Sequence, residues 1–396
     1  VCAWLAPLGA QAQAVARGVG PSTPGGRQRG AEPENNAIEP VAAASSTAPS
    51  DGQEFEQGLF EDSFAEEQAQ HDGDSEGSHW GPLACRLVVR QTVAPPQQQP
   101  AVLTCVALNV NGTLAATGGD DHHVRLWRTE DGRLLAVLKG HQDWVRACLF
   151  EPDGTGLLTC GDDRLLFRWD LQHLGERRLV ARHAAAALAM ALLTDQRQVA
   201  AAGFEPRVWL HPLAAREASA PLAAPCPDMR GLAASPDGNL LAAAGRCGTV
   251  RVWRTDTWEV VWNLKEAGGR IRSLAFSPQG TFLAAGGEGE HILVWEADSG
   301  VLAQTLPARP GKALALVFCD EQTLAVGSSQ NEIRLWNVEA AELVQRLEGH
   351  TGSVAGLAWH GGSGMLASVS FDTTLRLWQR EGARPQVART PAAAGR

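Results

Sequence analysis

Apolar and polar positions alternate in a short, regular rhythm over most of the chain. From about Arg86 to Trp378, apolar segments of five to seven residues are separated by residues typical of turns. Segments of that length are typical of β-strands rather than helices. The intervening turns, such as "EPDG" from Glu151 and "SPDG" from Ser235, carry the Asp and Gly that tight hairpins need. The pattern predicts an all-β domain.

Tryptophan recurs through this region with a nearly constant period. Each Trp closes a strand-like segment such as "VRLW" or "IRLW", and the intervals are 42, 40, 44, 42, 41 and 42 residues. A unit of about 42 residues with four short strands matches one blade of a β-propeller. The intervals on either side of Trp209 predict a third unit that is two residues short near "GFEPRVW". The seven residues are Trp127, Trp169, Trp209, Trp253, Trp295, Trp336 and Trp378.

These seven units resemble the WD-repeat (Trp-Asp repeat) β-propeller family, and the resemblance covers about Arg86 to Gln379. It implies a seven-bladed β-propeller of four-stranded antiparallel blades. It also implies that the strand before the first unit completes the last blade, with Leu87 to Val93 beside Leu375 to Trp378. Such a latch would leave no open sheet edge.

Two units share one set of polar residues at identical spacing. The His precedes the Asp by 22 residues in both, the hydroxyl residue lies four before the Asp, and the Trp lies six after it. The family resemblance implies a buried hydrogen-bond network, whereas a catalytic triad would need an accessible nucleophile. Because the set occurs twice, we predict a structural role. The sets are His141, Thr159, Asp163 and Trp169, and His350, Ser368, Asp372 and Trp378.

The other units retain the set only in part. Asp121 keeps the Asp position of the first unit, and His183 is interpreted as a remnant in the third. The residues predicted at the Asp position of the remaining units are Gly203, Cys247, Gly289 and Gln330.

Cysteine and histidine patterns indicate no metal site and no cofactor. The eight cysteines include no C-x-x-C pair. Cys148 and Cys160 flank the turn "PDG" almost symmetrically, which raises the hypothesis of a cross-strand disulfide. The run "DDHH" from Asp120 to His123 lies on a tight turn, where adjacent side chains rarely converge on one ion.

Residues outside the repeats divide the chain into further segments. Residues 1–18 are either the remnant of a signal peptide, which would place the protein outside the cytoplasm, or an Ala-rich leader, which would leave it cytoplasmic. Residues 19–84 have the composition of a disordered acidic linker, and 381–396 that of a disordered tail, around a propeller at 85–380. In the linker, Phe55, Leu59, Phe60 and Phe64 could lie on one side of a short helix; they form either a docking motif or a linker with a few apolar residues.

Charge is concentrated in that linker. The net charge is -10, yet Asp51 to Glu76 contains ten carboxylates and no Lys or Arg, which leaves 34 acidic against 34 basic residues elsewhere. A neutral body disfavours nucleic-acid binding. No apolar run reaches the ~18 residues of a membrane span.

We therefore predict a non-catalytic scaffold that binds protein or peptide partners through propeller loops and faces, as a monomeric propeller within a complex. The alternative is a propeller enzyme with a site over the central channel. Trp144 is either an exposed hot spot or packed on its own loop. Arginines two residues before five of the seven Trp residues are predicted to form ion pairs on the blade surface: Arg125, Arg207, Arg251, Arg334 and Arg376. The candidate partner contacts are Asp143, Trp144, Arg270 and Lys312.

Overall fold

A computed structural model describes residues 80–91, 100–193, 198–214, 219–265 and 268–382. The chain divides into two units, Val1–Ser75 and Glu76–Arg396, and all described residues belong to the second. The predicted leader, most of the predicted linker with Phe55, Leu59, Phe60 and Phe64, and the tail from 383 lie outside them.

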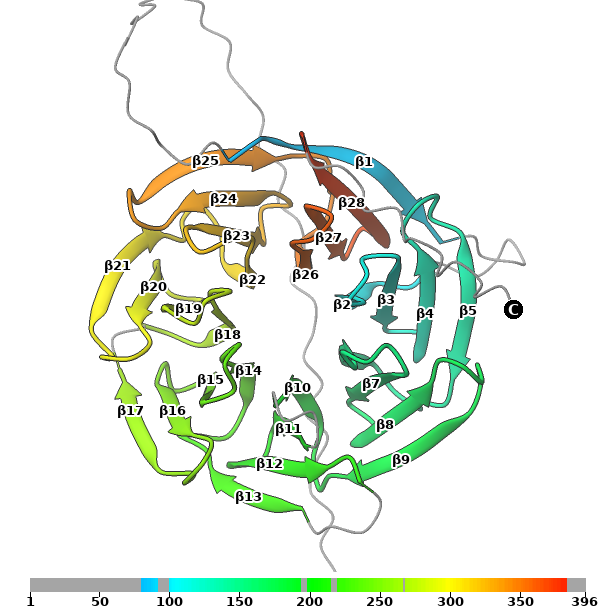
Figure 1. Cartoon of the computed structure of the whole chain (residues 1–396), viewed down its shortest axis with the longest axis horizontal. Coiled ribbons are helices and arrows are strands. Elements are labelled where there is room, and N and C mark those ends of the chain that lie inside the picture. The colour runs from blue at the N-terminus through cyan, green and yellow to red at the C-terminus, as the bar shows by residue number, and fades with distance from the viewer. Residues whose placement is uncertain (1–79, 92–99, 194–197, 215–218, 266–267, 383–396) are drawn as a thin grey trace, which may run out of the picture. The chain divides into compact units, whose positions relative to one another are not determined.

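The described residues form seven antiparallel four-stranded sheets arranged around a channel, which confirms the predicted propeller (Figure 1). Along the chain, blade 1 is β2 (Leu103–Leu108), β3 (Leu114–Gly119), β4 (His123–Arg128) and β5 (Leu134–Lys139). Blade 2 is β6 (Val145–Phe150), β7 (Gly156–Gly161), β8 (Leu165–Asp170) and β9 (Arg177–Arg182). Blade 3 is β10 (Ala187–Leu192), β11 (Gln198–Gly203), β12 (Arg207–Pro212) and β13 (Ala220–Ala223). Blade 4 is β14 (Met229–Ala234), β15 (Leu240–Gly245), β16 (Val250–Arg254) and β17 (Val260–Leu264).

The last three blades repeat this order. Blade 5 is β18 (Ile271–Phe276), β19 (Phe282–Gly287), β20 (His291–Glu296) and β21 (Leu302–Pro307). Blade 6 is β22 (Ala313–Phe318), β23 (Thr323–Ser328), β24 (Ile333–Asn337) and β25 (Glu342–Leu347). Blade 7 is β26 (Val354–His360), β27 (Met365–Ser370) and β28 (Thr374–Arg380), completed by β1 (Leu83–Arg90).

Strand β1 closes the ring, as the sequence predicts. It runs antiparallel to β28, and its partners include Leu377 for Leu87 and Leu375 for Val89. It is also tied to blade 6, because the Gln345 side chain accepts from the Leu83 N–H at 2.9 Å and donates to the Leu83 carbonyl at 2.8 Å. Strand β1 also contacts blade 1, where the Arg86 guanidinium donates to the Glu130 carbonyl at 2.9 Å, so the start of the described chain joins the first blade to the last.

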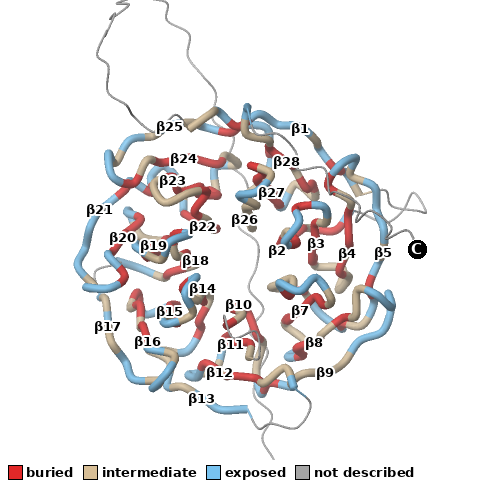
Figure 2. The backbone as a smooth tube through the Cα atoms, viewed as in Figure 1, coloured by how far each residue is buried: buried red, intermediate tan, exposed pale blue. Residues whose placement is uncertain are grey.

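The core lies between neighbouring blades rather than within one sheet. The second strand of each blade is almost fully buried, and in blades 1, 3, 4 and 5 it is rich in Ala, while the outermost strand is largely exposed (Figure 2). Small residues let adjacent twisted sheets approach, and the large side chains of one blade pack against them. In one such cluster Ala200 and Ala202 of blade 3 pack with Met229 and Trp253 of blade 4.

A β-bulge recurs in the first strand of every blade. The register between first and second strands shifts by one residue at the same place in all seven sheets, for example between Leu103 and Cys105 and between Met229 and Gly231. A bulge residue has no partner on the neighbouring strand, and its side chain points away from the ladder. The bulge therefore frees one side chain per blade at the channel.

The hypothesis of a Cys148–Cys160 disulfide is wrong. Both cysteines are free, and the register places Thr159 opposite Cys148 and Ala147 opposite Cys160. The two cysteines are thus one step out of register, and neighbouring positions along a strand point to opposite faces of a sheet.

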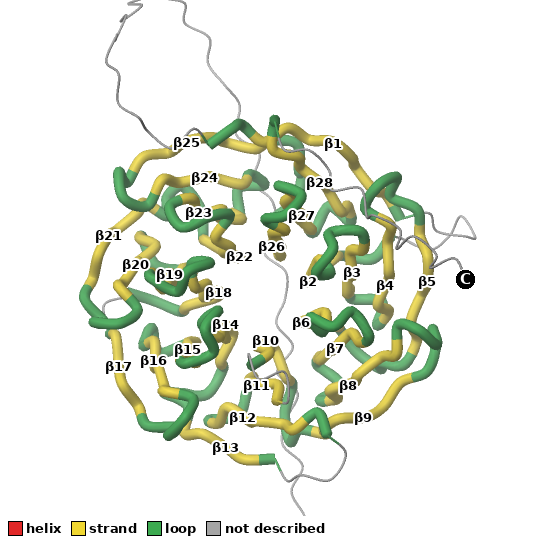
Figure 3. Tube along the Cα trace, in the orientation of Figure 1, coloured by secondary structure: helices red, strands yellow, loops and turns green. Residues whose placement is uncertain are grey.

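The described part of the chain consists of strands and loops (Figure 3), and none of it forms a helix with the length and apolarity of a membrane span.

The closing strand provides a test of the ring. Leu83 is 2% exposed and packs in a core cluster with Trp378, whereas Val88 in the same strand is 36% exposed. We expect Leu83→Ala to lower the free energy of unfolding by about 2–5 kcal/mol, because a buried methyl cluster is replaced by a cavity. Val88→Ala should change it by less than about 0.5 kcal/mol. Chemical denaturation of both variants measures the difference, and equal effects would contradict a latch that packs through Leu83.

Candidate functional site

One end of the propeller carries two sets of loops, and we call it the loop face. It comprises the connections between blades and the loops between the second and third strands of each blade. The two sets are joined by the same backbone hydrogen bond in every blade, such as Asp162 N to the Trp144 carbonyl at 2.9 Å. The seven donor–acceptor pairs are Asp120 and Val102, Asp162 and Trp144, Phe204 and Ala186, Arg246 and Asp228, Glu288 and Arg270, Ser329 and Lys312, and Phe371 and Ser353. The opposite end, with the hairpins between first and second and between third and fourth strands, is the turn face.

The bulge residues line the channel next to these loops. All seven border one cavity in the channel, together with Phe371. They are Thr104, Arg146, Leu188, Arg230, Arg272, Leu314 and Ala355. Three of the seven are therefore arginines at the mouth of the channel.

Each channel arginine pairs with a carboxylate of its own blade. Arg146 Nε lies 2.9 Å from Asp162 and Arg230 Nε lies 2.9 Å from Asp228. In blade 5, Arg272 Nε donates to Glu288 at 3.1 Å. The ion pair with Arg272 lowers the pKa of Glu288, with further contributions from Lys312 and Arg270. Each carboxylate of the channel mouth is thus engaged by an arginine of its own blade.

The four predicted partner contacts lie on the loop face. The exposed Asp143 accepts from the Trp144 N–H at 2.8 Å. The Trp144 ring is half-buried under the Arg146 guanidinium, 4.5 Å from its centroid. Arg270 lies 3.3 Å from Asp228 and 4.0 Å from Glu288. Lys312 is exposed and makes no ion pair within the described residues. The structure therefore separates Trp144 on blade 2 from the pair Arg270 and Lys312 on blades 5 and 6.

The His–hydroxyl–Asp–Trp sets lie inside blades 2 and 7. His141 Nδ1 is 2.8 Å from Asp163 and its Nε2 is 2.8 Å from Thr159, which accepts from Trp169 Nε1 at 2.8 Å. The His141 side chain is 0% exposed. Blade 7 repeats the geometry with 2.8, 2.8 and 2.9 Å for the corresponding contacts of His350, Ser368, Asp372 and Trp378.

These aspartates tie an inter-blade loop to the loop after the second strand. Burial raises the pKa of Asp163, but hydrogen bonds from His141 and from the N–H groups of Gln142 and Leu165 outweigh it, so the pKa lies below its usual value. The same balance, with His350 as the main donor, lowers the pKa of Asp372. Both groups are buried and fully hydrogen-bonded, which suits a structural carboxylate and excludes contact with a substrate.

Blade 3 is not shortened, which corrects the prediction made from Trp209. Val199 of β11 pairs with His211, just as Leu157 of β7 pairs with Trp169, so His211 occupies the Trp position. Trp209 lies two residues earlier. By the same register Glu205, rather than Gly203, occupies the Asp position: it accepts from the N–H of Ala184 at 2.9 Å and from Trp209 Nε1 at 3.0 Å.

Two buried histidines replace the network in this blade. Ala201 stands where blade 2 has Thr159, and without a hydroxyl group His183 Nε2 approaches His211 Nε2 directly at 3.2 Å. Burial lowers the pKa of both, and nearby His183 contributes to bringing that of His211 to about 4. The pair is therefore neutral at pH 7.

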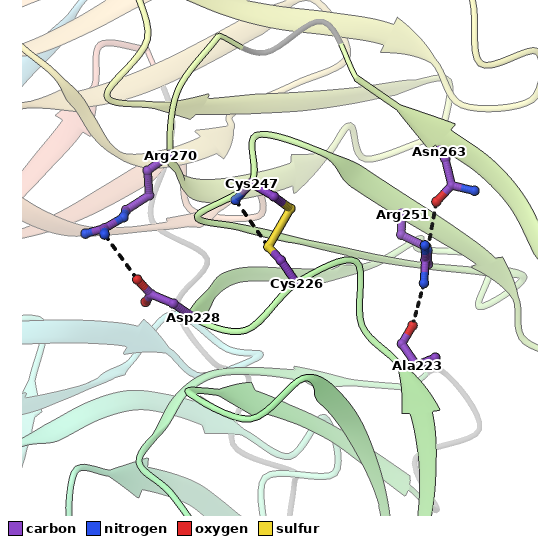
Figure 4. Close-up of a disulfide and its surroundings, with 7 residues drawn as sticks. All are labelled: Ala223, Cys226, Asp228, Cys247, Arg251, Asn263 and Arg270. Carbon is purple, nitrogen blue, oxygen red and sulfur yellow. Dashed lines mark hydrogen bonds and ion pairs between the residues drawn. A yellow bond between two sulfur atoms is a disulfide. The ribbon is translucent and has the colours of Figure 1, made fainter.

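Blade 4 carries a disulfide in the same place. Cys226 and Cys247 are bonded, with their Cα atoms 6.1 Å apart (Figure 4). They occupy the positions of Gln142 and Asp163, and in blade 2 the Gln142 N–H donates to the Asp163 carboxylate at 3.0 Å. A covalent bond thus links the inter-blade loop before β14 to the loop after β15, two residues from Asp228.

The recurring arginines mostly brace loops rather than forming surface ion pairs as predicted. Arg251 donates to the Ala223 carbonyl at 2.9 Å, and Arg376 to the Gly349 carbonyl at 2.5 Å. Arg334 donates to the carbonyls of Ala308, Arg309 and Pro310, and also pairs with Glu332. Arg125 pairs with Asp121, and Arg207 lies over the Trp209 ring.

The carboxylates of the "DDHH" turn are engaged by protein groups. Asp120 accepts from the Val102 N–H at 2.9 Å, and Asp121 binds Arg125 and contacts His123 at 3.4 Å. Among the described residues, one group has metal-ligand spacing: Asp170, His173 and Glu176, whose ligand atoms lie within 4.8 Å of one another on the surface of blade 2.

Sequence reasoning missed the ring of bulge residues. Their signal is the 42-residue spacing from Thr104 through Arg146, Leu188, Arg230 and Arg272 to Leu314, the second residue of each first strand. The contacts predicted from sequence were instead residues just before the first strands. Those residues lie on the connections between blades.

Family models match several blades. The model described as "WD domain, G-beta repeat" matches residues 93–128, 132–170 and 341–379. The model described as "Anaphase-promoting complex subunit 4 WD40 domain" matches residues 232–321. The first model thus covers the three blades that retain an Asp at the expected position, Asp121, Asp163 and Asp372.

Curated proteins match this chain over only part of their own length. Nuclear distribution protein PAC1-1 of Uncinocarpus reesii is 36% identical over 91 residues, which is 22% of this chain and 20% of that protein. Protein HIR1 of Cryptococcus neoformans var. neoformans serotype D is 26% identical over 200 residues, 43% of this chain and 23% of that protein. The match thus spans about a fifth to a quarter of the length of these relatives.

The disulfide of blade 4 predicts sensitivity to reductant. Closing a segment with a sequence separation of 21 residues should stabilise the fold by about 3 kcal/mol in the chain-entropy model. We expect a reductant to lower the thermal midpoint of the wild-type chain to about that of Cys226→Ser/Cys247→Ser, whose own midpoint should be lower without reductant and should not respond to it. Thermal unfolding with and without reductant measures this. A double variant that still responds to reductant would assign the effect to other cysteines.

The histidine pair predicts a loss of stability on acidification. The unfolded chain protonates these histidines below about pH 6.5, whereas folded His211 stays neutral until about pH 4. The free energy of unfolding should therefore fall by about 2 kcal/mol between pH 7 and pH 5. In His183→Gln/His211→Gln this part of the pH dependence should disappear, as chemical denaturation at both pH values would measure. An unchanged dependence would show that other groups cause it.

Proposed function

Because the chain belongs to the WD-repeat family of β-propellers, we propose that it is a non-catalytic scaffold that binds protein or peptide partners through its loop face. The observation that carries the proposal is the combination of residues gathered there. Two exposed aromatic rings and several arginines lie around one channel mouth, and both residue types are enriched where protein interfaces have their binding energy.

The aromatic contacts are well placed for a partner. Phe204 is 47% exposed and Phe371 48% exposed, and both occupy the same position after the second strand of their blades. Phe371 also borders the channel cavity. An exposed phenylalanine ring adds little to the stability of the propeller, and its contact with water is unfavourable. A partner that covers these rings is therefore favoured.

An enzyme over the channel is less well supported. The carboxylates at the mouth, Asp162, Asp228 and Glu288, each pair with an arginine, and both hydroxyl–His–Asp sets are buried. Among the described residues that border the channel cavity, no hydroxyl or thiol group is hydrogen-bonded to a histidine or a carboxylate in the way that covalent catalysis needs. The half-buried pair Ser363 and His360, 2.7 Å apart, lies in a hairpin of the turn face. The curated relatives are named as nuclear distribution proteins and HIR1, which favours an interaction role for this chain.

Ring closure supports a propeller that acts as a single copy within a complex. The pairing of β1 with β28 completes blade 7, so the edge strands among the described residues are the innermost strand of each blade, at the channel, and the outermost strand of each blade. Recruitment through side chains of the loop face is then favoured over pairing of strands between copies.

Site-specific photocrosslinking tests the proposal. A benzoylphenylalanine at Phe371 should form discrete adducts with a partner in an extract of the source cell, because the ring lies on the proposed contact face. The control is the same probe at Val110, which is 54% exposed in a turn-face hairpin. Equal adduct yields at the two positions, or adducts at Val110 alone, would place the contact elsewhere.

A further inference from the structure

Five cations form a continuous arc over blades 4 to 6 of the loop face, and we call them the basic arc. Arg230 and Arg272 are bulge residues at the channel, Arg270 and Lys312 precede β18 and β22, and Arg246 follows β15. The backbone bonds of the loop face fix their order, since Arg246 N donates to the Asp228 carbonyl at 3.1 Å. Figure 4 shows Arg270 reaching from blade 5 toward Asp228 of blade 4.

Within the basic arc, positive charge exceeds negative charge. Two carboxylates serve three guanidinium groups: Asp228 is shared by Arg230 and Arg270, and Glu288 by Arg272 and Arg270. Among the described residues, Arg246 and Lys312 have no ion-pair partner within 4.0 Å. The arc therefore has an excess of about three positive charges, counted from its five cations and two carboxylates. Arginine does not lose its proton in proteins, so the excess persists at all ordinary pH values.

The mutual repulsion of these groups is visible at Arg230. Burial lowers the pKa of this arginine first, and the neighbouring Arg272 and Arg270 lower it further despite the ion pair with Asp228. An anion bound across the arc would relieve this repulsion.

The opposite side of the channel mouth has no such excess of positive charge. On blades 1 and 2 the loop face carries Asp120, Asp143 and Asp162 together with Arg146 and the exposed Arg164. Positive charge on the loop face is thus concentrated on blades 4 to 6, which orients an acidic ligand as well as attracting it.

We infer that the basic arc binds an acidic peptide segment of a partner protein, with an apolar side chain of that segment on Phe204. This inference rests on the proposed function and specifies the chemistry of its ligand. Phe204 is exposed next to the arc, and the Arg230 guanidinium lies 5.7 Å from its ring centroid. Carboxylates on guanidinium groups beside an aromatic contact form the kind of desolvated charge pair that contributes to interfaces.

A peptide suits the arc better than a nucleic acid does. The charge excess covers only three blades of a chain whose net charge is -10, and on blades 1 and 2 carboxylates of the loop face offset the arginines there. Nucleic-acid binding needs cations along an extended backbone track. A short acidic segment needs only the arc.

The test is a binding titration with the full chain. The probe is a fluorescein-labelled peptide with Glu on both sides of a central Phe, and its partner probe has every Glu replaced by Gln. We expect saturable binding of the Glu peptide in fluorescence anisotropy, weakening as NaCl rises, and no binding of the Gln peptide. Arg246→Glu/Lys312→Glu should weaken binding by about tenfold or more, because repulsion replaces attraction at two positions.

The matched control is Arg133→Glu/Arg254→Glu. These exposed arginines lie at turn-face hairpins, and the double variant changes the net charge by the same amount. It should bind the Glu peptide as the wild-type chain does. Both altered pairs are exposed and free of ion pairs, and a thermal midpoint equal to wild type verifies that the variants fold.

Three results would overturn the inference. The first is equal weakening in the control variant, which would indicate a response to net charge alone. The second is equal binding of the Gln peptide. The third is preferential, arc-dependent binding of a labelled single-stranded oligonucleotide. Photocrosslinking at Phe371 separates the two proposals: if adducts persist in Arg246→Glu/Lys312→Glu while the Glu peptide fails to bind, the loop face is a partner site but its ligand is not acidic.

Discussion

Closure of the ring is the constraint on which the rest of this structure depends. Seven sheets can surround one channel only if each turns by the same angle and the last meets the first. The chain meets this condition with a repeat close to 42 residues and with β1, which joins the start of the described chain to β28. Buried second strands then set a uniform spacing between blades. The loop face exists because these two features hold the seven inner strands in one orientation.

The side-chain contact that joins each inter-blade loop to the loop after the second strand differs from blade to blade. Blades 2 and 7 use an aspartate held by a histidine, blade 3 a glutamate with a histidine pair, and blade 4 a disulfide. In blade 6, Arg334 binds three loop carbonyls, and the Nε1 of Trp336 has no partner because Val326 stands at the hydroxyl position. The geometry of the loop is conserved from blade to blade by different chemistry, so no single set of residues is essential to every blade.

The sequence was sufficient for the fold because its strongest signal, the recurrence of Trp, is a property of the blade itself. The Trp spacing gave the wrong repeat position in blade 3, because Trp209 lies two residues before that position and His211 occupies it. The pairing of β11 with β12 identifies the correct position, which residue type alone does not. The Cys148–Cys160 hypothesis failed for a related reason, since symmetry about a turn does not show which face of a strand a side chain takes. The channel arginines were missed because a bulge is a feature of pairing, which a single strand does not reveal.

The bulge of the first strand has a consequence for how such a protein changes over time. A residue that has no partner across the ladder and points into the channel can be exchanged without altering a hydrogen bond of the ladder. Seven such positions, now occupied by Thr104, Arg146, Leu188, Arg230, Arg272, Leu314 and Ala355, surround one opening. A repeat duplicated with an identical backbone ladder can therefore acquire a new ligand by substitution at a few of these positions, at the expense of the local side-chain contacts that Arg146, Arg230 and Arg272 make now.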